Sequence, residues 1–276
     1  MKRKYMIIVL MAGALELTGC SQGTSNSAKN GTTGSENTII SESDIAILDT
    51  EDMFTERDRD TEYDESECTA ISLSDEETKC DSDGVKMDGQ TVTITEGGTY
   101  LLTGSLSNGS VVVDTDKTEK VQLILENVSI INEEGAGICV EQADKVFITL
   151  ADGSTNKIVS NSFTGNEDTN IDGAIFSRED LTLNGSGTLK ITSAAHGIVS
   201  KDDLVLTGGV YQIQSEKQGL SGKESVRIAD GTFTITSGTD AIHSEDTDED
   251  TKGFVYITGG VLTLAAGGDG ISSSYV

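Results

Sequence analysis

Four segments in the C-terminal third of the chain align with one another on their apolar residues. They begin at Gly173, His196, Gln218 and Asp240, so the starts are 23, 22 and 22 residues apart, and a further start at Asp269 follows 29 residues later. Self-similarity at this period, with strand-like alternation and Gly-rich turns, is typical of a solenoid in which each repeat supplies one layer of a shared core. Any side chain repeated at one position then forms a ladder on the surface.

Short alternating strands continue through the chain from residue 85 onward. Segments such as Val121–Leu125, Val146–Leu150 and Thr232–Ile235 are strand-like, and none keeps a helical period over ten residues. Gly-rich breaks such as Thr207-Gly-Gly separate the strands, because glycine permits the positive φ of a tight corner. We predict an all-β chain that forms a single parallel β-helix, with about eight coils of about 22 residues. An antiparallel sandwich, the alternative fold, predicts irregular strand spacing instead of aligned copies.

The first 19 residues have the pattern of a bacterial lipoprotein signal peptide. Basic residues from Lys2 to Lys4 precede an apolar run, and the segment ends in Leu17-Thr-Gly-Cys20, which resembles a lipobox. The run is well under the roughly 20 residues that span a bilayer, so a transmembrane anchor is the weaker alternative. We expect cleavage before Cys20, a lipid on its thiol, and a location on the extracellular face of the bacterial cell membrane.

Residues 20–67 are rich in Ser, Thr and Gly and then become acidic. Such a segment cannot bury enough apolar surface to order itself. We therefore predict a disordered tether over 20–67 and a β-helix domain over 68–276. The chain stops at Val276, at the start of a further coil. Because a solenoid needs a cap at its last rung, this suggests a truncated end or a partner at that edge.

The chain is strongly acidic, with a formal net charge of -28. Phosphates would be repelled and there is no basic patch, so a nucleic-acid partner is excluded. The charge fits either a soluble extracellular surface or one neutralised by divalent cations such as calcium. His196 and His243 are the only histidines, so a His-based triad or metal cluster is hard to build. Cys68 and Cys80 are near enough in sequence to pair, whereas Cys139 lies in an apolar run and is expected in the core.

Two charged ladders follow from the repeat. The basic ladder consists of Arg178, Lys201 and Lys223, with Glu245 in the fourth copy, and the acidic ladder beside it consists of Glu179, Asp202, Glu224 and Asp246. One interpretation is an ion-pair lattice at the turns. The other is a strip that presents carboxylates to calcium and cations to an anionic sugar. In a lyase, the three basic residues would be the repeated candidates for the base, but bases beside carboxylates lack the lowered pKa that such chemistry requires.

An acidic insertion interrupts the fourth copy at residues 244–253. Asp246, Asp248 and Asp250 alternate as the oxygen ligands of a calcium loop do, although the Gly and the distal Glu of an EF-hand are missing. Neighbouring carboxylates repel one another unless a cation neutralises them. Asp240 and Asp269 flank the insertion, so we predict a calcium site shared by these two residues and the insertion. A mobile acidic loop is the alternative.

Several segments resemble the bacterial carbohydrate-binding domain-containing protein family over about residues 83–276. They are Gly98–Leu106, Ala143–Gly153, Ala174–Gly187, Gly253–Gly260 and Gly268–Ile271. The resemblance implies a right-handed parallel β-helix, calcium sites, and binding of cellulose or an acidic polysaccharide such as polygalacturonate. It also implies a shape like that of pectate lyases, without established catalysis. The family's acidic turn positions match Asp180, Asp202, Asp203, Glu224, Asp240 and Asp269, while His196 and Gln218 depart from the Asp or Asn that is common there.

These observations favour a non-enzymatic cell-surface lipoprotein that binds polysaccharide through calcium-dependent sites. The chain has no Trp and only 4% aromatic residues, which is a poor supply for a stacking platform on cellulose. An acidic glycan, such as one from plant cell walls, therefore fits better than a neutral chain. A calcium-dependent lyase of the pectate type and a structural or adhesive surface rod are the two alternatives.

Overall fold

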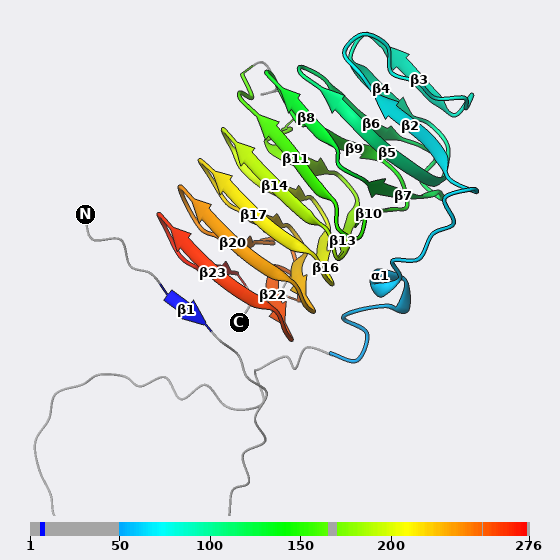
Figure 1. Cartoon of the computed structure of the whole chain (residues 1–276). Helices are drawn as coiled ribbons and strands as arrows, with labels where there is room; N and C mark the ends of the chain where they lie inside the picture. Colours follow the sequence, from blue (N-terminus) through cyan, green and yellow to red (C-terminus); the bar gives the residue numbers. More distant parts are fainter. Residues whose placement is uncertain (1–5, 9–49, 165–169, 250, 275–276) are drawn as a thin grey trace, which may run out of the picture.

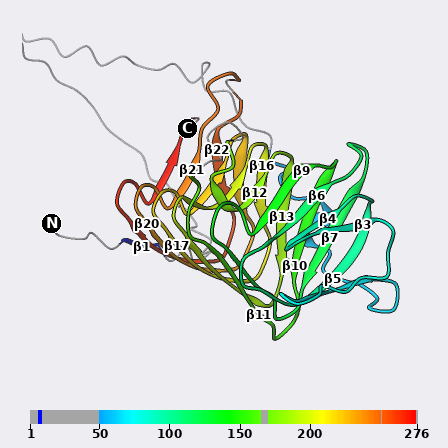
Figure 2. The ribbon, with the colours of Figure 1, turned by 90° about the horizontal axis from the view of Figure 1, so that it is seen from above.

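The computed structural model describes residues 6–8, 50–164, 170–249 and 251–274. Over these residues the chain is a β-solenoid of about seven turns, with coils about 25 residues apart. The coils stack along one axis, from β2 and β5 at one end to β22 and β23 at the other (Figure 1), and Figure 2 shows the same stack after a turn of 90°. The predicted all-β parallel solenoid is confirmed.

Three sheets run along the stack. Sheet A contains the last residues of β5 (Gly98–Leu106), then β8 (Ser129–Asn132), β11 (Thr155–Ser160), β14 (Thr188–Ser193), β17 (Val210–Ser215), β20 (Thr232–Ser237) and β23 (Val261–Ala266), with β1 (Met6–Ile8) antiparallel to β23. Sheet B contains β2 (Thr69–Leu73), the first residues of β5, β7 (Lys120–Leu125), β10 (Lys145–Leu150), β13 (Asp180–Gly185), β16 (Asp203–Leu206), β19 (Ser225–Ile228) and β22 (Phe254–Ile257). Sheet C contains β3 (Val85–Asp88), antiparallel to β4 (Thr91–Ile94), then β6 (Ser110–Asp114), β9 (Ile138–Gln142), β12 (Gly173–Ser177), β15 (His196–Ser200), β18 (Leu220–Gly222), β21 (Ile242–Ser244) and β24 (Ile271–Ser273).

Apolar ladders fill the interior of the solenoid. In sheet B the parallel register stacks one inward-facing residue per coil, in the order Leu123, Ile148, Leu183, Leu206, Ile228 and Ile257. The first five are fully buried. Because side chains alternate between the two faces of a strand, every second residue of each strand enters this shared core.

Glycine corners join sheet B to sheet A. Gly185, Gly209, Gly231 and Gly260 have φ values of +95°, +96°, +127° and +94°, which lie in the region that glycine adopts without steric cost. A side chain at Gly185 would also collide with the backbone of Leu150 in the preceding coil. The predicted Gly-rich corners are confirmed.

The period of 22 to 23 residues does not hold throughout the stack. Ile175 pairs with Ile198 and Ile198 with Leu220, as the repeat requires. Ile138, however, pairs with Ile175, 37 residues later, because an insertion after β11 lengthens that coil. The expectation of about eight coils of 22 residues is therefore corrected to about seven, with coils about 25 residues apart.

A second apolar cluster lies on the outer face of sheet C, and Ile171 from the insertion packs against it. Cys139, Phe176 and Val199 stack there in register and pack with Ala136 and Ile171. Cys139 is buried, as predicted, but it lies in this outer cluster and not in the interior of the solenoid. Burial raises the pKa of its thiol, and Glu141 adds to the shift. Cys68 and Cys80 are free thiols in the structure.

Residues 50–63 form a strap across the outer face of sheet B. The strap contains the one-turn helix α1 (Glu56–Arg59), which Thr55 caps through a capping box with Asp58. Composition predicts a disordered tether over 20–67, but the last part of that range is packed on the solenoid because Asp58 is buried against it. Cys20, residues 20–49 and all of the predicted signal peptide except β1 lie outside the described residues. Within the described residues, no helix has the length and hydropathy needed to cross a membrane.

Candidate functional site

A cleft opens on the outer face of sheet C, next to the apolar cluster. Along that face the register runs from Phe176 to Val199, Ser221 and His243, so the covering apolar residues give way to polar ones. The cleft has a volume of about 340 Å³. Its charged and imidazole side chains are Asp172, His196, Lys201, Lys223, His243 and Glu245.

His196 is held at the start of β15 by polar contacts on both ring nitrogens. Its Nε2 lies 3.3 Å from Oδ2 of Asp172, and its Nδ1 accepts a hydrogen bond from the backbone N–H of Gln218 at 3.3 Å. Burial alone would raise the pKa of Asp172, but the hydrogen bond from His196 and the charges of Lys201 and Lys217 outweigh it and lower that pKa. Asp172 therefore remains ionised and orients the imidazole.

His243 lines the same cleft two coils further along, in register with Val199. Its Nδ1 lies 3.2 Å from Oδ2 of Asp240, and its Nε2 lies 3.5 Å from Oε2 of Glu245. Asp240 also accepts a hydrogen bond from the backbone N–H of Asp269 at 2.7 Å. Asp240 and Asp269, which were predicted to flank a calcium site, are thus joined by a hydrogen bond. The second carboxylate oxygen of Asp240, however, faces the imidazole of His243.

The basic ladder borders the cleft. Lys201 and Lys223 line it with side chains that are 39% and 46% exposed, and their ammonium groups lie 3.6 Å from Asp172 and 3.4 Å from Asp248. Arg178 lies outside the lining, and its Nε donates to Glu141 at 2.6 Å. Nearby Asp246 and a hydrogen bond to Asp248 raise the pKa of Lys223, so Lys223 is held as a cation.

The acidic insertion folds back on its own backbone. Oδ1 of Asp246 accepts hydrogen bonds from the N–H groups of Asp248 and Glu249 at 2.7 and 3.2 Å. Oδ2 of Asp248 lies 3.4 Å from Nζ of Lys223. Asp250 lies outside the described residues. The carboxylates described here already accept from backbone N–H groups and from lysine, so in this arrangement they do not fit a shared calcium ion.

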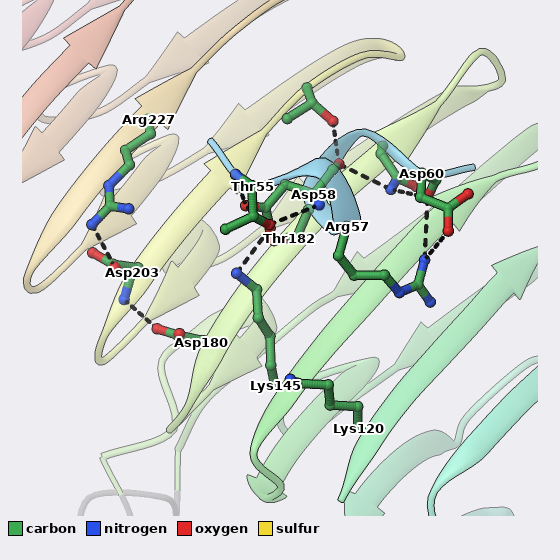
Figure 3. Close-up of polar contacts among 12 residues, drawn as sticks. Thr55, Arg57, Asp58, Asp60, Lys120, Lys145, Asp180, Thr182, Asp203 and Arg227 are labelled. Atoms are coloured by element: carbon green, nitrogen blue, oxygen red, sulfur yellow. Dashed lines mark hydrogen bonds and ion pairs between the residues drawn. The ribbon is translucent and has the colours of Figure 1, made fainter. Parts of the chain in front are cut away.

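Two of the four acidic turn positions between sheets C and B are paired with cations. Asp203 binds Arg227 at 2.6 Å, Glu224 binds Lys252 at 2.6 Å, and Asp180 accepts from the backbone N–H of Asp203 at 3.3 Å. Figure 3 shows Asp180, Asp203 and Arg227 in this arrangement.

Asp202 differs from these neighbours, because no ion pair to it is found in the described part of the chain. Burial and the nearby carboxylates of Glu224 and Asp180 raise its pKa to about 6. No group of three or more His, Cys, Asp or Glu side chains in that part of the chain is arranged to hold a metal ion.

The repeat does not predict that the two histidines share one cleft. His196 begins a copy of the repeat, whereas His243 is the fourth residue of the copy that begins at Asp240. The register aligns His243 with Val199 but His196 with Gly173, so only the three-dimensional structure shows that both side chains line this cleft. Asp172, which orients His196, was missed because it belongs to the insertion and to no repeated position.

The chain is similar to known proteins over most of the solenoid. A family model described as "Carbohydrate-binding domain-containing protein" matches residues 88–276. A protein of that description from Acetivibrio thermocellus is 35% identical over 137 residues, which are 48% of this chain and 48% of the relative, so the match spans about half of the relative's length. A solved structure of a polysaccharide lyase-like protein from C. thermocellum, as a gadolinium derivative, has a TM-score of 0.70 and 31% identity, with 76% of this chain and 95% of that chain covered.

Proposed function

We propose that this chain binds an acidic polysaccharide in the cleft on sheet C. The chain belongs to the family of carbohydrate-binding domain-containing proteins. The observation that carries the proposal is the position of Lys201 and Lys223 in a cleft with both histidines, on a chain whose net charge is -28. A uronate carboxylate would be repelled from most of such a surface, and accessible ammonium groups are the donors that recognise it.

The other cleft groups suit the hydroxyl groups of a sugar. The carboxylates of Asp172 and Glu245 accept hydrogen bonds, and the side-chain amide of Gln218 can both donate and accept. No Phe, Tyr or Trp is among the lining residues of the cleft. A platform that stacks on crystalline cellulose is therefore not supplied there.

Calorimetric titration with oligogalacturonate tests this proposal, with a neutral cello-oligosaccharide of equal length as the comparison. We expect oligogalacturonate to bind at least about tenfold more tightly than the neutral chain, and its affinity to fall as salt is raised, because charged contacts are screened. Equal affinities for the two sugars, or no heat from either, would contradict binding of an acidic glycan.

A lyase is the second candidate function, favoured by the lysines and imidazoles around one cleft. The base that would abstract the proton beside a uronate carboxylate needs an accessible neutral form. Lys223 does not fit that role, because Asp246 and Asp248 raise its pKa. Absorbance of the unsaturated uronate product would reveal cleavage. A flat trace across a range of calcium concentrations and alkaline pH would leave binding alone.

Calcium is proposed as a stabilising ion at the turn that holds Asp202. Its carboxylate lies near those of Glu224 and Asp180 and has a raised pKa, which is the electrostatic condition that a cation relieves. Calcium prefers such oxygen ligands, and the similar solved protein was obtained as a gadolinium derivative. Binding there requires these side chains to turn toward one another, so the proposal rests on charge and not on a preformed cage.

The pH dependence of stability tests the proposal at Asp202. The folded pKa of about 6 exceeds the ordinary value of 3.8, so the folded chain binds the extra proton between these values and loses stability as pH rises through this window. In calcium-free buffer at pH 7, Asp202→Asn is expected to be more stable than the wild type by about 1 kcal/mol, after discounting for partial exposure. Asp88→Asn, at an exposed position on β3, is the control.

Calcium should remove that difference by stabilising the wild type and not Asp202→Asn. Thermal unfolding at pH 7 and at pH 5, with calcium and with chelator, gives the four values needed. A calcium-induced rise in Tm of the same size in both proteins would place the ion elsewhere.

The lipid anchor on Cys20 and the location on the extracellular face of the cell membrane are proposed from the sequence pattern alone. Metabolic labelling with a fatty acid is expected to mark the wild type and not Cys20→Ser. Release of Cys20→Ser into the medium would support the anchor, and equal labelling of the two proteins would exclude it.

A further inference from the structure

The strap crosses sheet B along the axis of the solenoid and contacts strands of six successive coils. At one end, the ring of Phe54 lies 6.0 Å from that of Tyr256 on β22, and the backbone carbonyl of Met53 accepts from Arg227 on β19. At the other end, Arg57 donates to Gln122 on β7 at 2.8 Å. The strap therefore follows the path that an extended polymer would take across the coils.

Asp58 joins the middle of the strap to the sheet. Its Oδ1 lies 2.8 Å from Nζ of Lys145 and accepts a hydrogen bond from Oγ1 of Thr182 at 2.7 Å, as Figure 3 shows. Its side chain is 3% exposed. Burial alone would raise the pKa of Asp58, but the hydrogen bonds from Lys145 and Thr182 outweigh it and lower that pKa. Sheet B thus contains a built site for a carboxylate, and the strap fills it.

The chemistry of this face extends beyond the carboxylate. Asn184 donates to the backbone carbonyls of Asp58 and Asp60 at 3.2 and 2.9 Å, and Thr207 donates to that of Asp58 at 2.6 Å. The guanidinium of Arg57 lies over the ring of Phe147, 4.5 Å from its centroid. Amides, hydroxyls, a cation and an aromatic ring are the groups with which proteins bind sugars, and on sheet B Asn184, Thr182, Lys145 and Phe147 supply them against the strap.

Sheet A shows that an outer face of this solenoid does not need such groups. There the corresponding ladder of Lys157, Lys190, Gln212 and Thr234 is exposed to solvent. On sheet B, by contrast, Thr182 and Asn184 are fully buried although they point away from the core. Their burial is a consequence of the strap.

We propose that the outer face of sheet B is a second carbohydrate site, for a glycan that carries carboxylate groups, and that the strap occupies it in place of the glycan. Asp58 stands where the carboxylate of the sugar would bind Lys145 and Thr182. The site is separate from the cleft on sheet C, and the inference rests on the carbohydrate binding of the family and not on that cleft. Because strap and glycan compete for one face, the apparent affinity is reduced by the fraction of chains whose strap is closed.

The test uses the full chain with the cleft disabled by Lys201→Ala and Lys223→Ala. In this background, two changes release the strap. One is Asp58→Lys, which places two ammonium groups together, and the other replaces residues 53–60 by alternating Gly and Ser. We expect either change to strengthen oligogalacturonate binding at least about tenfold relative to the native strap, with a stoichiometry near one. Adding Lys145→Ala should abolish the gain.

Two outcomes overturn the proposal. One is the absence of any gain in both strap variants. The other is a gain that survives Lys145→Ala, since binding would then not use the carboxylate site. Failure of the cleft proposal is distinguishable, because it shows as full binding by the Lys201→Ala and Lys223→Ala protein with its native strap.

A second measurement needs no change in the strap. In the cleft-disabled protein, excess oligogalacturonate should displace the strap and accelerate tryptic cleavage at Arg57 and Arg59 by severalfold. A synthetic peptide of residues 50–63 should in turn compete with oligogalacturonate for the Gly/Ser variant. Cleavage rates that do not change with the glycan, together with no competition by the peptide, would make the strap a permanent part of the fold.

Discussion

Replacing Tyr211 by alanine is expected to lower the free energy of unfolding by about 4 kcal/mol, because a fully buried aromatic ring is lost from a core that cannot collapse around it. Tyr211 on β17 is fully buried, and its ring stacks on that of Phe233 in the next coil, with centroids 4.8 Å apart and planes 5° from parallel. Each coil of a solenoid is stabilised chiefly by its neighbours, so this cavity weakens the contact between two coils.

Two matched variants show whether the loss belongs to the ring. Tyr211→Phe keeps the stack and is expected to change stability by less than about 1 kcal/mol. Gln212→Ala, at the adjacent exposed position, is expected to stay within about 0.5 kcal/mol. Guanidinium unfolding at 25 °C measures all three. A loss below about 1 kcal/mol for Tyr211→Ala would contradict the packing of these two coils.

The fold could be predicted because its determinants are local and repeated. The apolar positions around Leu183, Leu206 and Ile228 recur at the coil period, and the coils that contain them turn at glycines such as Gly209 and Gly231. A pattern that occurs several times predicts the register between neighbouring strands as well as the strands themselves. The long coil between Ile138 and Ile175 was misjudged because an insertion has no counterpart in the other copies.

The strap could not be predicted because its partners are distant and its composition is that of a tether. Thr182 lies 124 residues from Asp58, and Asn184 lies 126 residues from it. An acidic segment with few apolar residues does not indicate burial. Its order comes from contacts with distant coils, such as those of Asp58 with Lys145 and Thr182, and no pattern within the segment shows them.

The candidate site was predicted in part. The repeat identifies Lys201 and Lys223 as neighbours on one ladder, and both line the cleft. It does not show that Asp240 faces His243 or that Asp246 accepts from its own loop. Spacing in the sequence gives the number of nearby carboxylates, whereas the direction of each carboxylate depends on the backbone that follows it.

Replacing Lys201 and Lys223 together by alanine is expected to weaken the binding of oligogalacturonate about 100-fold, because each lysine would supply one charge-assisted hydrogen bond to a uronate carboxylate. The matched control is the pair Lys157→Ala and Lys190→Ala. These two lysines are also neighbours in register, but they lie on the exposed face of sheet A. Both double variants remove two positive charges, so the long-range electrostatic change is the same.

The comparison of the two double variants separates a site from a general charge effect. If the glycan binds in the cleft, the control pair should bind within about twofold of the wild type at 0.15 M salt, because its lysines lie on another face and the Debye length is about 8 Å. Equal losses in the two variants would mean that the glycan senses only net charge. Retained binding in both would move the site away from the cleft, since no other pair of accessible lysines borders it among the described residues.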